Sequence, residues 1–168
     1  CKGKSYLNYP IGVQQGVLLH REIDSFIDNH AAVRAIRKKL HAPLPKVSGI
    51  VIDLYFDHLL AKHWHLFHDL TLVDFLSLFY KHTLSINSTY PDKFLLFIEK
   101  LRESKWMNHY SSTFGFQKSC EGVSRRLSFE NELKNAPTLI RPHEVDLFET
   151  FKIYMNDAKD RFSKEDLN

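Results

Sequence analysis

The chain has 168 residues, 43% of them hydrophobic and 26% charged, a composition typical of a globular rather than a disordered protein. Six Gly and six Pro are too few for a turn-rich β-sandwich or barrel. A formal net charge of +3 argues against a dedicated nucleic-acid binder, and no apolar run reaches the roughly 18 residues of a membrane span. We therefore expect neither a nucleic-acid nor a membrane partner.

Cysteine and histidine usage gives the next constraints. Cys1 and Cys120 form neither a disulfide scaffold nor a zinc-finger spacing, so we expect a reduced, cytoplasmic protein. Ten His residues are a surplus of side chains that bind metals and transfer protons. With no internal repeat, low-complexity tract or long linker, residues 1–168 are predicted to form one domain.

Helical periodicity dominates the first half of the chain. Residues 13–40 are predicted to form one or two helices, divided at Asn29–His30 and closed before Pro43. A helix over 48–67 with Ser48 as its N-cap follows, and then a helix over 71–86. The core residues expected in the first stretch are Val17, Leu18, Ile23, Phe26, Ile27, Val33, Ile36 and Leu40.

The second half continues the pattern. Pro91 is expected in the first turn of a helix that carries Phe94, Phe97, Ile98 and Leu101. A short segment around 106–110 precedes a helix near 115–130. The last helix shows an apolar stripe of Phe148, Phe151, Met155, Ala158 and Phe162. Because no segment alternates with period two, the predicted fold is all-α, a single compact multi-helix domain.

Two groups of polar residues lie among apolar ones. His20, Asp24 and Asp28 are four residues apart, so a helix places them on one stripe. Asp53 and Asp57, with His58 beside them, belong to a helix that is apolar nearly all round and is therefore expected to be buried.

Buried carboxylates are costly unless they are paired or bound to a metal. A mixed nitrogen and oxygen shell from both helices would suit Mn²⁺, Fe²⁺ or Mg²⁺. The alternative is that Arg21, Arg34 and Arg37 neutralise the aspartates as plain ion pairs.

Further histidines and basic residues surround these motifs. His63 follows His58 by five residues and could lie near the same site, whereas His65 and His68 are interpreted as solvated or packing residues. Between residues 29 and 52 there is no acidic residue, and this stretch could steer an acidic partner or a phosphate group. Its basic residues are Arg34, Arg37, Lys38, Lys39 and Lys46. Arg125 and Arg126 form a second basic pair able to grip phosphate.

The stretches Gly16–His30 and Asp53–Trp64 resemble the two best-known stretches of the acyl-carrier-protein phosphodiesterase family, and Trp106–Tyr110 and Arg125–Arg126 resemble weaker later ones. The resemblance implies an all-helical fold related to HD-type phosphohydrolases. It also implies removal of the 4′-phosphopantetheine arm from holo-acyl carrier protein, an acidic substrate, with Mn²⁺ or a similar divalent ion as cofactor. The family has a further N-terminal stretch with a Gly-Asp-Phe element, which we expect this chain to lack.

The spacing of His and Asp residues and the resemblance to the family together predict metal-assisted phosphodiester hydrolysis. The predicted metal ligands are His20, Asp24, Asp57 and His58. The order Asp57-His58 is the reverse of the His-Asp doublet of HD enzymes, so the ligand roles of those enzymes cannot be transferred to this chain. Asp28 and Asp53 are expected in support, His63 as the general acid, and Arg125 and Arg126 on the phosphate. The basic stretch from Arg34 to Lys46 would dock the acidic carrier protein.

Two other functions stay open at this point. One is a phosphohydrolase of the same chemistry that acts on a nucleotide or another small phosphodiester. The other is a non-catalytic helical module that binds an acidic protein through its basic patch. The oligomeric state is left open.

Overall fold

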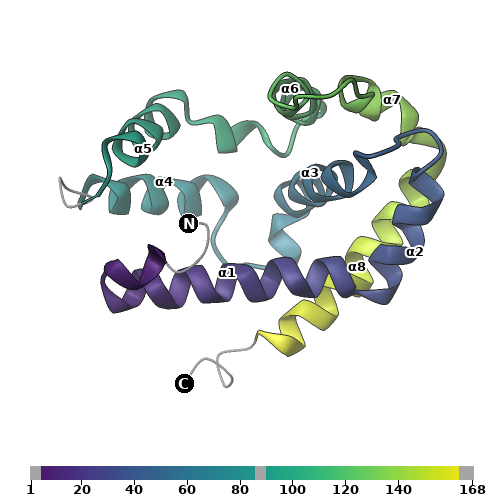
Figure 1. The fold of residues 1–168 in the computed structure, drawn as a ribbon. Coiled ribbons are helices and arrows are strands. Elements are labelled where there is room, and N and C mark those ends of the chain that lie inside the picture. Colours follow the sequence, from purple (N-terminus) through teal and green to yellow (C-terminus); the bar gives the residue numbers. More distant parts are fainter. Residues whose placement is uncertain (1–4, 86–89, 163–168) are drawn as a thin grey trace. The chain divides into compact units, whose positions relative to one another are not determined.

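A computed structural model describes residues 5–85 and 90–162, and every regular element in these ranges is a helix (Figure 1). The all-α prediction is confirmed. The chain divides into two compact units, unit 1 with Cys1–Lys39 and His143–Asn168 and unit 2 with Leu40–Pro142. The single domain over 1–168 stays a prediction, and the predictions for Cys1 and for a helix end at Ile86 fall outside the described residues. Within the described part of the chain, each helix is too short or too polar to cross a membrane.

Unit 1 contains the long helices α1 (Ile11–Asn29), α2 (Ala31–Leu40, whose last residue belongs to unit 2) and α8 (Glu144–Arg161), with the short helix η1 (Ser5–Asn8) before them. The predicted division at Asn29–His30 is confirmed, because His30 adopts an extended conformation between α1 and α2. Aromatic rings join α1 to the C-terminal segment, since Phe26 lies 5.7 Å from Tyr154 and 5.5 Å from Phe162.

The buried residues of unit 1 differ in part from those predicted. Val33 and Ile36 are buried, as expected, but α1 contains no buried residue, and Leu18 and Ile23 are exposed. In α8 the buried face is centred one residue earlier than the predicted stripe, on Leu147, Thr150, Phe151 and Tyr154. The spacing of apolar residues thus predicted the helix correctly but not which of its apolar residues are covered.

Unit 2 contains the remaining helices, and α3 and α6 pack side by side within it (Figure 1). Its α-helices are α3 (Ser48–Lys62), α4 (Leu72–His82), α5 (Asp92–Ser104), α6 (Thr113–Ser124) and α7 (Ala136–Leu139). Its short helices are η2 (Trp64–Leu66), η3 (Thr83–Ser85), η4 (Trp106–His109) and η5 (Leu133–Asn135), and η6 (Arg141–His143) leads out of it.

Helix α3 supplies much of the core of unit 2, as its apolar sequence predicts. Its buried residues are Ser48, Val51, Ile52, Tyr55, Phe56, His58 and Leu59. Two expectations for it were wrong: Val47 rather than Ser48 is the N-cap, and the helix ends at Lys62 rather than near 67. It ends early because the chain tightens into η2 and turns back, a turn that the Trp64 indole N–H stabilises by donating to the Leu70 carbonyl.

Helix α6 is shorter than the predicted helix near 115–130. Ser112 caps its start, since its Oγ accepts a hydrogen bond from the Gly115 N–H at 3.0 Å. After Ser124 the Asn131 side chain hydrogen-bonds to both the hydroxyl and the carbonyl of Ser124, which turns the chain away. Leu133 in η5 and Ala136 in α7 are fully buried, although no helix was predicted there.

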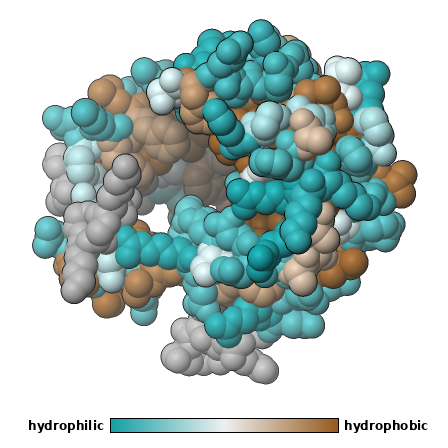
Figure 2. Space-filling model, turned by 45° about the vertical axis from the view of Figure 1, so that its right-hand side comes forward, coloured by the Kyte–Doolittle hydropathy of each residue, from teal (hydrophilic) through white to brown (hydrophobic). Residues whose placement is uncertain are grey.

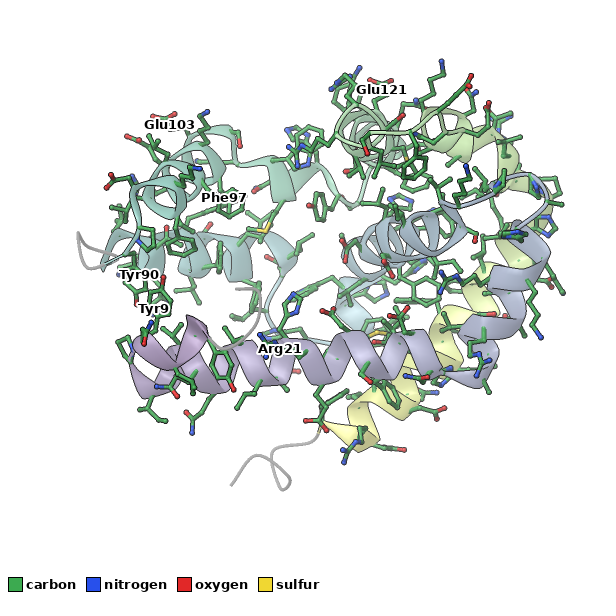
Figure 3. The ribbon with its side chains drawn as sticks, in the orientation of Figure 1. Tyr9, Arg21, Tyr90, Phe97, Glu103 and Glu121 are labelled. Atoms are coloured by element: carbon green, nitrogen blue, oxygen red, sulfur yellow. The ribbon has the colours of Figure 1, made fainter. Side chains whose placement is uncertain are left out.

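Helix α5 begins at Asp92, with Pro91 as its N-cap rather than in its first turn as predicted, and only part of its apolar face is covered. Ile98 is buried, whereas Phe94 and Phe97 are exposed, which corrects their prediction as core residues. Figure 3 shows Phe97 on the side of α5 that faces α4. In Figure 2, hydrophobic residues reach the surface in separate patches among hydrophilic ones.

Candidate functional site

The geometry of His58 is set by three elements of unit 2. Its Nδ1 lies 2.7 Å from the carbonyl oxygen of Tyr110, between η4 and α6. Because a carbonyl oxygen only accepts, Nδ1 carries the proton and Nε2 presents its lone pair. The imidazole lies near the rings of Tyr55 and Phe116, each 5.7 Å away, and the residue is only 7% exposed. One tautomer and one ring orientation are thereby selected.

Asp57 lies beside His58 at a small recess, here called the Asp57–His58 recess. Its lining residues are Leu54, Asp57, His58, Tyr110, Phe116 and Ser119. Its volume is about 10 Å³, close to the space of a single water molecule. Asp57 keeps contact with solvent, which corrects the expectation of a buried carboxylate, yet the surrounding protein raises its pKa from 3.8 to about 6 by desolvation.

Tyr110 faces the same recess and was not assigned a role from the sequence. Burial raises the pKa of its phenol, and the charge of Asp57 and the neighbouring Tyr80 raise that pKa further. The phenol therefore stays a neutral O–H group at pH 7. The only sequence signal for Tyr110 was its place in the short stretch after Trp106, and Ser119 and Phe116 carried no signal.

The predicted stripe on α1 is an exposed one. His20 Nδ1 lies 2.9 Å from the Asp24 carboxylate, with side-chain exposures of 76% and 62%, so these two residues form a solvated pair one turn apart. Asp28 pairs with Arg37 at 3.6 Å, which is the ion-pair alternative noted for the aspartates. The apolar residues beside this stripe on α1 leave it open to solvent.

The donors in the recess fit a divalent metal in their chemistry. Asp57 offers a carboxylate oxygen whose negative charge desolvation disfavours, and a cation would offset that cost. A ligating His commonly donates its other ring N–H to a carbonyl, as His58 does to Tyr110. The other two predicted ligands, His20 and Asp24, belong to unit 1. Within either unit, the described residues contain no group of three or more His, Cys, Asp or Glu side chains placed to hold a metal.

Two of the supporting residues, Asp53 and His63, lie on or just after α3. Asp53 is exposed one turn before Asp57. His63 is the C-cap of α3 and is not among the residues that line the Asp57–His58 recess. Partial desolvation lowers the pKa of His63, and the charges of Lys62 and His65 lower it further. His65 and His68 line a separate open cavity, where the His68 ring stacks on Trp64.

The predicted basic patch consists of residues with different partners. On α2, Arg37 pairs with Asp28 and Lys39 with Asp146, whereas Arg34 and Lys38 are exposed and form no ion pair with the described residues. Lys46 belongs to unit 2, where its ammonium lies 5.8 Å from the centre of the Phe129 ring. Arg125 and Arg126 are exposed just after α6.

Comparison with known proteins places these residues in a family. A family model described as acyl carrier protein phosphodiesterase matches residues 1–158. Proteins named acyl carrier protein phosphodiesterase from Salmonella agona (strain SL483) and Klebsiella pneumoniae (strain ATCC 700721 / MGH 78578) are each 28% identical to the chain over 126 residues. The match covers 74% of this chain and 65% of the length of each relative. No solved structure matches the chain.

Proposed function

Because the chain belongs to the acyl carrier protein phosphodiesterase family, we propose that it is a hydrolase that removes the 4′-phosphopantetheine arm from holo-acyl carrier protein. The observation that carries the proposal is the Asp57–His58 recess, where a carboxylate of raised pKa adjoins an imidazole held in one tautomer. A carboxylate with a strongly raised pKa in a concave site is a common feature of catalytic centres. The cytoplasmic location and the relation to HD-type phosphohydrolases remain part of this proposal.

The proposed reaction is the hydrolysis of one P–O bond. The oxygen of a water molecule forms a bond to phosphorus, the bond from phosphorus to the serine oxygen breaks, and the serine oxygen takes up a proton. When bound, a divalent cation, proposed to be Mn²⁺ with Mg²⁺ or Fe²⁺ as alternatives, would polarise the phosphoryl oxygens. Asp57 and His58, which line the recess, would hold it; His20 and Asp24 stay ligands predicted from the sequence.

The remaining residues have supporting roles in the proposal. Asp28 and Asp53 would stabilise the positive charge of the site, and His63 would give its proton to the serine oxygen. Arg125 and Arg126 are exposed and would bind the phosphate group bidentately.

The acidic protein substrate would dock on the exposed basic residues. Arg34 and Lys38 lie one turn apart on α2 and form no ion pair with the described residues, so their charges are available to a partner. Arg37 and Lys39 contribute less, because Asp28 and Asp146 already neutralise them. On unit 2, Lys46 over the Phe129 ring would add a second contact.

The direct test is mass spectrometry of holo-acyl carrier protein after incubation with the protein and Mn²⁺. We expect the carrier protein to lose the mass of the prosthetic arm. His20→Ala and Asp57→Ala should abolish this loss and metal binding without unfolding the chain. Glu103→Ala is the matched control, since Glu103 is an exposed acid on the outer side of α5 (Figure 3). No loss of mass with any divalent metal would remove the proposal.

One alternative function has a specific observation in its favour. The basic residues Arg34 and Lys38 would also serve a non-catalytic module that binds an acidic protein. A metal-free protein that binds acyl carrier protein but leaves its prosthetic arm intact would support this module. Turnover of a nucleotide or another small phosphodiester in preference to the carrier protein would support the other alternative, a phosphohydrolase that acts on small phosphodiesters.

A further inference from the structure

The Asp57–His58 recess contains a polar group that the proposed reaction does not yet use. Asp57 and the Nε2 of His58 are hydrogen-bond acceptors there, and no Lys or Arg side chain is among the six lining residues. The two remaining lining residues with a polar side chain are Tyr110 and Ser119. A phosphate oxygen at this recess needs donors, and among the side chains of the lining residues these two carry neutral hydroxyl donors.

Tyr110 is the better placed of the two donors. Neither the Tyr110 phenol nor the Ser119 hydroxyl hydrogen-bonds to another of the described residues. A serine within a helix can still turn its hydroxyl to the carbonyl four residues earlier, an acceptor that the phenol of Tyr110 lacks. Asp57 and Tyr110 line the same recess, and the charge of Asp57 raises the pKa of the Tyr110 phenol.

The backbone holds Tyr110 in a fixed position relative to His58. Its carbonyl accepts the His58 Nδ1–H bond at 2.7 Å, and its N–H donates to the Met107 carbonyl at 3.2 Å. The carbonyl of the preceding residue, His109, accepts from both the N–H and the Oγ of Ser112. The backbone from which the phenol projects is therefore tied to the imidazole, as a preorganised donor requires.

We propose that Tyr110 is a substrate-binding residue whose phenolic O–H donates a hydrogen bond to a phosphoryl oxygen held in the Asp57–His58 recess. The inference rests on the proposed function for the identity of the substrate, but not for the binding of phosphate. A neutral donor suits this position because it binds an anionic oxygen without pairing permanently with Asp57. Charge develops on the phosphoryl oxygens as water attacks, so the hydrogen bond strengthens in the transition state.

The test compares Tyr110→Phe with Tyr80→Phe. Tyr110→Phe keeps the ring and the carbonyl that positions His58, and removes only the hydroxyl. Tyr80→Phe is the matched control because it removes a tyrosine hydroxyl from the same unit whose partner is Asn108, at 3.3 Å. The first measurement is the dissociation constant of inorganic phosphate, with and without Mn²⁺. The second is kcat for release of the prosthetic arm.

We expect phosphate binding about 10-fold weaker in Tyr110→Phe and kcat lower by about 10²-fold, with thermal unfolding unchanged and Tyr80→Phe close to wild type. Phosphate affinity equal in wild type and Tyr110→Phe, or no binding to wild type, would overturn the inference, as would equal losses in both variants. If wild type releases no prosthetic arm but Tyr110→Phe still weakens phosphate binding, the inference on Tyr110 stands and the proposed function fails.

Discussion

Gly115 allows a close approach between two backbone segments of unit 2, and replacing it provides a sharp test of the site. A Cβ at this position would lie 2.0 Å from the His109 carbonyl oxygen and 2.6 Å from its carbon. Ordinary contacts of a Cβ begin at 3.4 Å, so the carbonyl would have to retreat by about 1.4 Å. It is not free to move, because the N–H and the Oγ of Ser112 both donate to it.

The expected cost of Gly115→Ala combines overpacking with weakened hydrogen bonds. Overpacking a tight site costs about 1–3 kcal/mol, and each weakened hydrogen bond about 1 kcal/mol. We therefore expect the free energy of unfolding to fall by about 3 kcal/mol. Gly122→Ala is the matched control, since it lies in the same helix and a Cβ there meets no atom within 4 Å. Alanine is the better helix former, so this variant should gain up to about 1 kcal/mol.

Urea unfolding followed by circular dichroism measures both values, and equal m-values in the three proteins would show that only stability changes. The shift of His109 would also draw the Tyr110 carbonyl from His58, so Gly115→Ala should bind metal and substrate more weakly even when folded at low temperature. A Gly115→Ala variant within about 0.5 kcal/mol of wild type would refute the close approach and, with it, the anchoring of His58 by this segment.

Three further predictions concern charge. In metal-free protein the raised pKa of Asp57 makes the folded state bind an additional proton between pH 3.8 and about 6. The free energy of unfolding therefore decreases as pH rises through this window. Asp57→Asn should be more stable than wild type at pH 7.5 but not at pH 3.5. The rise in the Asp57 pKa corresponds to at most about 3 kcal/mol of stability, and solvent access to the side chain reduces this to about 1 kcal/mol. Unfolding curves that give the same stability difference between the two proteins at both pH values would contradict this prediction. If His63 donates the proton, kcat should decline as pH rises through the pKa of His63, which lies below 6.5. His63→Gln should lose this decline along with most of its activity. A dependence of kcat on pH that is the same in the variant and in wild type would show that another group is the donor. The double variant Arg34→Glu/Lys38→Glu should have a several-fold higher KM for the carrier protein at low salt and an unchanged turnover of a small phosphodiester. An unaltered KM would show that the carrier protein docks on another surface.

Local sequence signals predicted the helices well where short-range physics decides them. The break between α1 and α2 follows from Asn29–His30, and α5 begins directly after Pro91. The end of α6 was missed because Asn131, seven residues further on, hydrogen-bonds to Ser124 and redirects the chain. That contact depends on how the chain returns, which the helical pattern does not contain.

The candidate site was found only in part from the sequence. Asp57 and His58 were identified from their places in an apolar helix, and the structure puts both at one recess. Tyr110 and Ser119 were given no role in the site because they lie more than 50 residues further along the chain and have no spacing relation to α3. Only the packing of α6 on α3 brings them to the same place.

The amino-acid sequence by itself determined the helical class, most helix positions and the pairing of carboxylate with histidine on α3, because these depend on neighbours within a few residues. The tertiary structure decided which apolar residues are buried, as Phe97 and Ile98 on the same helix demonstrate. It also decided the tautomer of His58, the raised pKa of Asp57 and the place of the Tyr110 phenol. These properties arise from desolvation and hydrogen bonding between distant segments, and periodicity along one chain carries no information about them.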